Sequence, residues 1–189
     1  MALIPYVDPA DVDGRAAELL DEDADYYGRP SLFARAMATN PRVFAVRNDY
    51  HRELVREGDL AGRTAELAYL AVSVANECDY CTASHGETLV ETAGGDPDEV
   101  AAVRAGDLDG FEPRERAVIA FATAVATDPK RIDGDDLDNL RDVGFDEAGI
   151  VELLTVSTAA VAANTFADAL GIDPTDRPEP FVGADLAED

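Results

Sequence analysis

The segment at residues 62–77, GRTAELAYLAVSVANE, constrains the fold more than any other part of the chain. Written as a helix, it is apolar on nearly all of its sides, and in a soluble protein such a helix must be surrounded by other elements. Strand-type alternation is almost absent elsewhere, whereas helical periodicity recurs from end to end with matching stop signals. We therefore predict an all-α fold built around one central, buried helix.

Capping signals divide the rest of the chain into helices. Asn40 and Pro41 supply an N-cap and a first-turn proline for a helix that ends at Gly58. The helix after the central one should begin around the cysteines and stop at the glycines 94–95. Further helices are predicted from Gly14 to Glu22, from Ser31 to Thr39, from a capping box at residues 96–99, from Pro113 to about Thr127, from Gly134 to about Val143, and from Asp146 to about Leu170.

Length and composition favour a single domain over residues 1–189. The chain has 47% hydrophobic residues, enough for one core, and no composition shift marks a second unit. The proline-rich tail from about residue 172 should be irregular. The first residues carry acids and no basic region, so we expect neither a signal peptide nor a membrane span.

Charge narrows the choice of partner. The chain has 40 Asp and Glu against 15 Lys and Arg, a formal net charge of -25. The acids are spread over every predicted helix, which favours a solvated acidic surface screened by high salt, in a salt-rich cytoplasm, over a disordered acidic arm. Such a surface repels phosphate backbones and anionic lipid, so we expect no nucleic-acid or membrane partner.

The chain has only two cysteines, Cys78 and Cys81. Two are too few for the disulfide framework of a secreted mini-protein. In a cytosolic chain, cysteines this close together indicate redox chemistry or metal binding.

The cysteines belong to a constellation that can move protons. On a helix, spacings of three and four place Cys78, Cys81 and His85 in one stripe. The start of that helix would favour a thiolate at Cys78. Glu66 lies in the most apolar segment, where burying a carboxylate is costly unless it is paired or carries protons. A chain reversal near Asn76 would bring Glu66 beside His85 and create a proton relay that serves a nucleophile.

The pattern Glu66, Cys78-x-x-Cys81 and His85, preceded by residues 60–63 (LAGR), resembles the active-site signature of the alkylhydroperoxidase D family, which belongs with the carboxymuconolactone decarboxylases. The spacing from the glutamate to the cysteines is the distinctive part of this signature. Two more segments resemble the peroxidase-related branch of that superfamily: residues 4–7 (IPYV) and residues 166–171 (FADALG).

The resemblance implies an all-helical fold that assembles as trimers or hexamers. It also implies a peroxiredoxin-type oxidoreductase that reduces hydroperoxides through a cysteine sulfenic acid and then a Cys78–Cys81 disulfide, re-reduced by an unidentified dithiol or lipoyl-type protein. Combined with the helix geometry, it makes Cys81 the attacking thiol, one turn before His85, and Cys78 the resolving thiol that also meets the reductant first. Tyr80 stands where the best-studied members have histidine, which leaves the substrate open.

Other interpretations of the same residues remain. Glu66, Cys78, Cys81 and His85 could bind structural zinc, and Glu66 alone could pair with a buried arginine. The chain could also be a redox sensor whose disulfide alters assembly without turnover. Decarboxylation is the less expected chemistry, because the true decarboxylases do not depend on a CxxC pair. No residue pattern indicates a flavin, haem or nicotinamide site, so no cofactor or metal is expected.

Two further features of the sequence are a second histidine and a possible internal repeat. His51 reads as an exposed helical residue, and Tyr80 as a packing residue beside the site. A shift that aligns residues 66–67 with 152–153 also places Tyr80 on Phe166, which suggests a duplicated helical unit whose second copy lost the cysteines.

Overall fold

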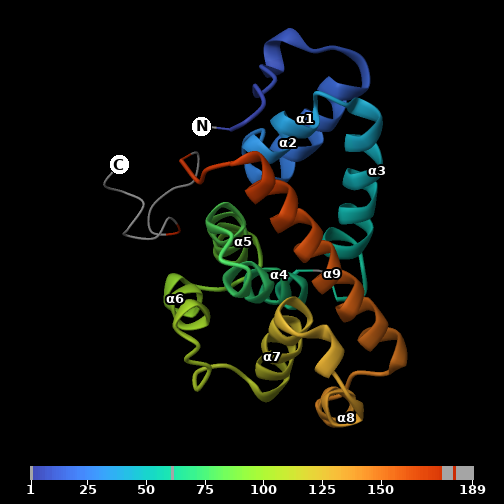
Figure 1. Ribbon diagram of the computed structural model, residues 1–189, viewed down its shortest axis with the longest axis vertical. Helices are drawn as coiled ribbons and strands as arrows, with labels where there is room; N and C mark the ends of the chain where they lie inside the picture. The colour runs from blue at the N-terminus through green and yellow to red at the C-terminus, as the bar shows by residue number, and fades with distance from the viewer. Residues whose placement is uncertain (1, 61, 176–180, 182–189) are drawn as a thin grey trace.

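The computed structural model describes residues 2–60, 62–175 and 181, and in this part every regular element is helical, which confirms the all-α class. The α-helices are α1 (Gly14–Tyr27), α2 (Leu32–Met37), α3 (Pro41–His51), α4 (Arg63–Ala75), α5 (Asp79–Thr92), α6 (Pro97–Ala105), α7 (Pro113–Thr127), α8 (Gly134–Asp142) and α9 (Glu147–Leu170), shown in Figure 1. Short 3-10 turns lie at Pro9–Asp11 (η1) and Pro129–Arg131 (η3), and a π-helical segment, η2, at Arg52–Arg56.

Most helix starts follow the capping signals of the sequence. The Asn40 side chain accepts a hydrogen bond from the Val43 N–H at 3.3 Å, and Asp96 and Glu99 form the expected capping box. Two boundaries differ from prediction. Helix α1 continues beyond residue 22 until Gly28 ends it in a left-handed conformation, and the helix that begins at Pro41 changes to π geometry at η2.

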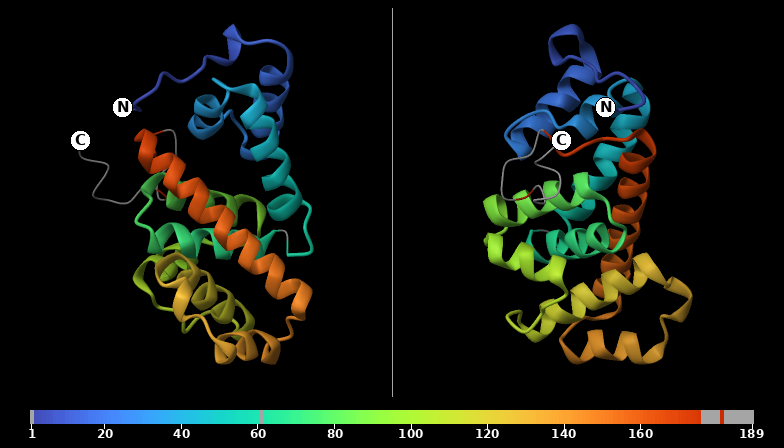
Figure 2. Two further views of the ribbon diagram at one scale, coloured as in Figure 1. Left: turned by 45° about the vertical axis from the view of Figure 1, so that its right-hand side comes forward. Right: turned by 60° about the vertical axis from the view of Figure 1, so that its left-hand side comes forward.

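Helix α4 lies at the centre of the molecule. All residues from Ala65 to Ser73 are buried, and the helix packs against α5, α7 and α9 (Figure 2). The segment that is apolar on all sides is therefore the central helix, as its composition predicts.

Helix α9 is long and apolar enough to cross a membrane by length and composition alone. Half of its apolar window is buried inside the protein, where the helix packs against α4 and α7. These contacts are those of a core helix, and they explain its apolar composition without a bilayer.

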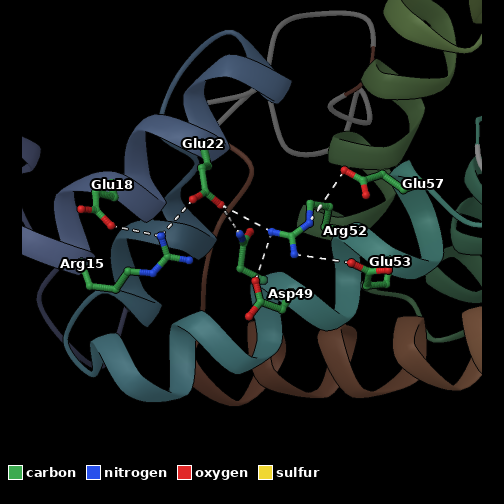
Figure 3. Close-up of polar contacts among 8 residues, drawn as sticks. Arg15, Glu18, Glu22, Asp49, Arg52, Glu53 and Glu57 are labelled. Atoms are coloured by element: carbon green, nitrogen blue, oxygen red, sulfur yellow. Dashed lines mark hydrogen bonds and ion pairs between the residues drawn. The ribbon is translucent and has the colours of Figure 1, made fainter.

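Arginine–carboxylate contacts connect helices around this core. The Arg63 guanidinium at the start of α4 forms a two-pronged contact with Glu99 of α6 and donates from Nε to Glu115 of α7 at 2.6 Å. On the surface, Glu22 of α1 accepts from Arg15 at 3.0 Å and lies 4.0 Å from Arg52 of η2 (Figure 3). The surface network joins α1 to the end of α3, although each exposed pair contributes little to stability.

The proposed internal repeat is not visible at the predicted register. The alignment places Glu66 and Tyr80, which lie on the separate helices α4 and α5, onto Glu152 and Phe166, which lie on the single helix α9. The predicted irregular tail falls mostly outside the described residues. Its described members Ile172 and Phe181 are buried against the core.

Candidate active site

The cysteines lie at the turn between α4 and α5. Helix α4 ends at Ala75, Glu77 adopts a left-handed φ of 56°, and Cys78 is the extended N-cap residue of α5. The backbone N–H of Cys78 donates to Ser73 O at 3.0 Å, which fixes the reversal. Both cysteines are buried free thiols, and Cys81 lies in the first turn of α5.

The reversal brings Glu66 of α4 against His85 of α5, as the sequence predicts. Glu66 Oε2 lies 2.7 Å from His85 Nδ1, and the glutamate is 0% exposed. A contact this short between a carboxylate and a ring nitrogen is a charge-assisted hydrogen bond whenever the imidazole is protonated. Because Nδ1 is engaged by the carboxylate, Nε2 is the nitrogen left to exchange protons with a neighbouring thiol.

A tyrosine from α1 completes the carboxylate's partners. The Tyr26 O–H donates to Glu66 Oε1 at 3.1 Å. Burial, together with the nearby charge of Glu66, raises the pKa of the Tyr26 phenol, so this donor keeps its proton. Glu66 is therefore held by an imidazole and a phenol. Within the described residues it forms no salt bridge with an arginine, which was the alternative partner.

Tyr69 fixes the plane of the imidazole. Its ring stacks on the His85 ring with the centroids 4.1 Å apart and the planes at 26°. Tyr69 is itself fully buried on α4. The His85 ring is thus set by the stack on one face and by Glu66 at its edge, which is the arrangement that a positioned acid–base group requires.

His51 is not the exposed residue that the sequence suggests. It is 1% exposed, its ring centroid lies 6.4 Å from that of His85, and within the described residues neither of its ring nitrogens has a hydrogen-bond partner. Burial lowers the pKa of His51 well below its ordinary value, with smaller contributions from the charges of Arg47 and Arg56. The two histidines of the chain therefore lie in one cluster around Tyr69.

The two sulfur atoms interact with each other. A hydrogen bond to the Cys81 side chain, and then burial, raise the pKa of the Cys78 thiol. The raised pKa runs against the expectation that the helix start favours a thiolate at Cys78, because the neighbouring sulfur and burial both favour the protonated thiol. Cys78 keeps its proton and can donate it to a thiolate at Cys81.

A small cavity opens onto Cys81. Its volume is about 30 Å³, enough for a water-sized molecule. The α5 side of the wall consists of Tyr80, Cys81, Ser84 and His85, whereas Cys78 does not reach it. The remaining wall comes from Asp23, Tyr27, Ser31, Phe33, Arg47 and Ala163. Cys81 is therefore the sulfur that a small reactant in the cavity can meet.

Metal binding gains no support from the geometry. In residues 2–60, 62–175 and 181, no three His, Cys, Asp or Glu side chains are arranged to hold an ion. Glu66 directs its two oxygens to His85 and Tyr26, so the four residues of the zinc alternative do not share one centre.

Sequence comparison supports the resemblance to the family. Residues 41–124 match the carboxymuconolactone decarboxylase family, a span that contains Glu66, both cysteines and His85. No curated protein matches the sequence.

Solved structures confirm the alkylhydroperoxidase D fold. A peroxidase-related protein from Ralstonia eutropha, described as an AhpD core, superposes with a TM-score of 0.84 at 23% identity over 96% of this chain and 94% of that chain. A peroxidase-related protein from a Silicibacter species gives 0.82 at 20% identity over 96% and 93%. A cysteine-to-alanine variant of the debrominase Bmp8, in complex with 2,3,4-tribromopyrrole, gives 0.80 at 18% identity over 100% and 97%. At these identities the likeness concerns the fold.

Several residues of the site escape sequence reasoning. Tyr26, Arg47 and His51 come from α1 and α3, and only tertiary packing brings them to the α4–α5 hairpin. Tyr69 lies within the apolar segment and reads there as an ordinary core residue. The sequence does carry one indication for His51: it is one of only two histidines in the chain, and the other, His85, belongs to the site.

The burial of His51 predicts a pH-dependent stability. Below its ordinary pKa of about 6.5 the unfolded chain binds a proton at His51 that the folded protein does not bind, so the free energy of unfolding falls as the pH falls. This contribution is at most about 1.4 kcal/mol per pH unit. His51→Phe should remove it, so urea unfolding between about pH 5 and pH 7 should give a flatter curve than the unsubstituted protein. Parallel curves would show that His51 is protonated within the fold.

Proposed function

We propose that this chain, whose residues 41–124 match the carboxymuconolactone decarboxylase family on an AhpD-like fold, is a thiol-dependent peroxidase that reduces hydroperoxides. One observation carries the proposal. Cys81 and His85 line the same cavity, and the His85 ring is held at Nδ1 by a fully buried glutamate. A thiol, a base and an orienting carboxylate in this order are the parts that an activated nucleophile requires.

In the first step, the Cys81 thiolate attacks the terminal oxygen of the hydroperoxide. The S–O bond forms as the O–O bond breaks, so that sulfur is oxidised to sulfenic acid and the peroxide is reduced to an alkoxide. His85, which takes the thiol proton before the attack, returns it from Nε2 to the alkoxide, and an alcohol leaves. The Glu66 carboxylate stabilises the imidazolium between these two transfers.

In the second step, Cys78 attacks the Cys81 sulfenic acid. Its thiol keeps its proton until this point because its pKa is raised, and the His85–Glu66 pair accepts that proton. The S–S bond forms, the S–O bond breaks, and the hydroxyl leaves as water after protonation. The products are a Cys78–Cys81 disulfide and one molecule of water.

Two electrons from an external dithiol restore the thiols by disulfide exchange. We propose a dithiol or lipoyl-type protein for this role. The expectation that Cys78 meets the reductant first concerns the disulfide and stays a prediction. In the thiol form, Cys78 is 0% exposed and Cys81 lines the cavity. We also propose a cytoplasmic location, because two cysteines are too few for the disulfide framework of a secreted mini-protein.

The alternatives make different predictions about turnover. A redox sensor forms the same disulfide but consumes one equivalent of peroxide and stops, whereas a catalyst supplied with a dithiol consumes many. A decarboxylase would act on its substrate without the cysteines. Peroxide consumption in the presence of excess dithiothreitol distinguishes all three.

Serine substitutions test the roles of the two cysteines. Cys81→Ser should abolish the stoichiometric reaction with peroxide, because it removes the sulfur that faces the cavity. Cys78→Ser should still form a sulfenic acid that dimedone traps, but it should not cycle with dithiol. Mass spectrometry locates the trapped group. If the adduct forms on Cys78 in the Cys81→Ser protein, the roles are reversed, and if both variants keep full activity, the thiol mechanism is wrong.

Substitutions of the relay test its contribution to turnover. Glu66→Gln and His85→Gln should each lower kcat by about 10²–10⁴-fold, the range for loss of a positioned acid–base group. Glu91→Gln, an exposed glutamate on α5, is the matched control and should keep full activity. Circular dichroism should show the same helix content in all three variants. Normal turnover in a folded Glu66→Gln protein would remove the carboxylate from the mechanism.

We also propose that the protein is a homo-oligomer, a trimer or hexamer. Exposed apolar side chains lie at helical spacing on α3 (Val43, Val46 and Tyr50) and on α9 (Val151 and Leu154). Val46 is 70% exposed and Val151 63%, a costly exposure unless another surface covers them. Light scattering in high salt should give an oligomer that Val46→Asp weakens and Leu3→Asp, at an exposed apolar residue outside these two sets, does not. A monomer at all micromolar concentrations would contradict the proposal.

We further propose that the fold requires salt. The net charge of -25 opposes compaction, and lowering the salt from 1 M to 0.01 M lengthens the screening distance from about 3 Å to about 30 Å. The unfolding temperature should therefore fall on dilution of the salt. Sodium sulfate and sodium chloride compared at equal ionic strength separate screening from surface exclusion. An unfolding temperature that stays constant over this range would refute the proposal.

A further inference from the structure

Arg47 brings a positive charge to the wall of the thiol cavity. It lies on α3, is half-buried, and lines the same cavity as Cys81 and His85. Within the described residues, no carboxylate oxygen lies within 4.0 Å of its guanidinium, and it makes no hydrogen bond. Its closest aromatic contact is with Phe33, whose ring centroid lies 4.6 Å from the guanidinium carbon.

Among the residues that the structure describes, Arg47 has no carboxylate partner, although the chain is strongly acidic. Acidic residues outnumber basic ones 40 to 15. In the described part of the chain, other arginines bind carboxylates: Arg15, Arg29, Arg52, Arg63 and Arg141. Arg35, Arg104, Arg114 and Arg116 donate to backbone carbonyls. Arg47 retains its donors next to the reactive sulfur.

The aromatic contact holds the guanidinium without using its N–H groups. Phe33 packs in turn against Phe166 of α9, with the ring centroids 4.8 Å apart, so the platform beneath Arg47 is part of the core. Stacking on a ring face leaves the planar fork of donors free for a second planar group.

Asp23 lies on the same cavity wall, but its carboxylate forms no ion pair with Arg47 within 4.0 Å. Its Oδ2 accepts the Ser31 N–H at 2.7 Å. Burial raises the pKa of the Asp23 carboxyl, and the charges of Arg56 and Arg47 act in the opposite direction. Arg47 is the one arginine among the described residues that line the cavity, and Asp23 does not occupy its donors.

We propose that Arg47 is the substrate-binding residue for a carboxylate group, so that the natural substrate is a small carboxylate-bearing hydroperoxide of which only the peroxide end enters the cavity at Cys81. The inference rests on the proposed reaction at Cys81 and adds the class of substrate. A carboxylate matches the guanidinium fork with two parallel hydrogen bonds. The acidic surface of the protein repels anions, so a cation beside the thiol attracts an anionic substrate to this site.

The test uses two thiol reagents that differ in charge. Iodoacetate carries a carboxylate where iodoacetamide carries a neutral amide, and both alkylate a thiolate. In a Cys78→Ser background Cys81 is the only cysteine, so the loss of iodide at constant ionic strength reports one site. The ratio of the two rate constants cancels any change in the amount of thiolate.

Arg47→Gln in that background should lower the iodoacetate-to-iodoacetamide ratio by about 10- to 100-fold, the effect of losing a hydrogen bond to a charged group. Arg42→Gln, an exposed arginine on the same helix, should leave the ratio unchanged. An equal loss of rate with both reagents would overturn the proposal, since Arg47 would then act only on the thiolate. An unchanged ratio would overturn it as well.

A second measurement needs no substitution of Arg47. In the Cys78→Ser protein that retains Arg47, sodium acetate should slow alkylation of Cys81 by iodoacetamide, whereas sodium chloride at the same ionic strength should not. Equal effects of the two salts would contradict carboxylate binding. Neither measurement involves peroxide, so a failed peroxidase assay would refute the proposed function and leave the result for Arg47 standing.

Discussion

The contact between Glu66 and His85 is the interaction on which the site depends. A carboxylate at the centre of an apolar core costs several kcal/mol unless it is paired and hydrogen-bonded. Here its two oxygens meet the His85 imidazole at 2.7 Å and the Tyr26 phenol at 3.1 Å. Breaking either contact would leave a buried charge with one partner fewer, so this local geometry is held as firmly as the core around it.

The rest of the fold can be understood as support for this contact. Helix α4 carries Glu66 and Tyr69, and its enclosure by α5, α7 and α9 keeps water from the carboxylate. The turn at Glu77 places Cys78 and Cys81 at the start of α5, so that one short hairpin holds both sulfurs and the imidazole. Helices α1 and α3 cover the open side and add Tyr26, His51 and Arg47. The hairpin supplies the reacting groups, and the amino-terminal helices shape what reaches them.

The sequence predicts features that lie within short stretches of chain. It misses contacts between residues that are far apart in the sequence. Stop and cap signals locate α7 to the residue, and the spacing of Glu66, Cys81 and His85 predicts the hairpin contact, because these features lie within short stretches of chain. The sequence places His51 on the surface, because a short, polar helix gives no indication of which elements cover it, whereas the folded residue is buried. The raised pKa of Cys78 depends on the neighbouring sulfur and on burial, which helix position alone does not report. The position of Arg47 on the cavity wall follows only from the tertiary fold.

The central claim is that Cys78 and Cys81 form one redox centre that a single molecule of peroxide oxidises. Its most direct test is a titration of the fully reduced protein with hydrogen peroxide, followed by intact-protein mass spectrometry without added dithiol. The account predicts a mass loss of about 2 Da, complete at one equivalent, as both thiols become a disulfide. An unchanged mass, or a product that gains about 16 Da and never loses it as water, would contradict the account.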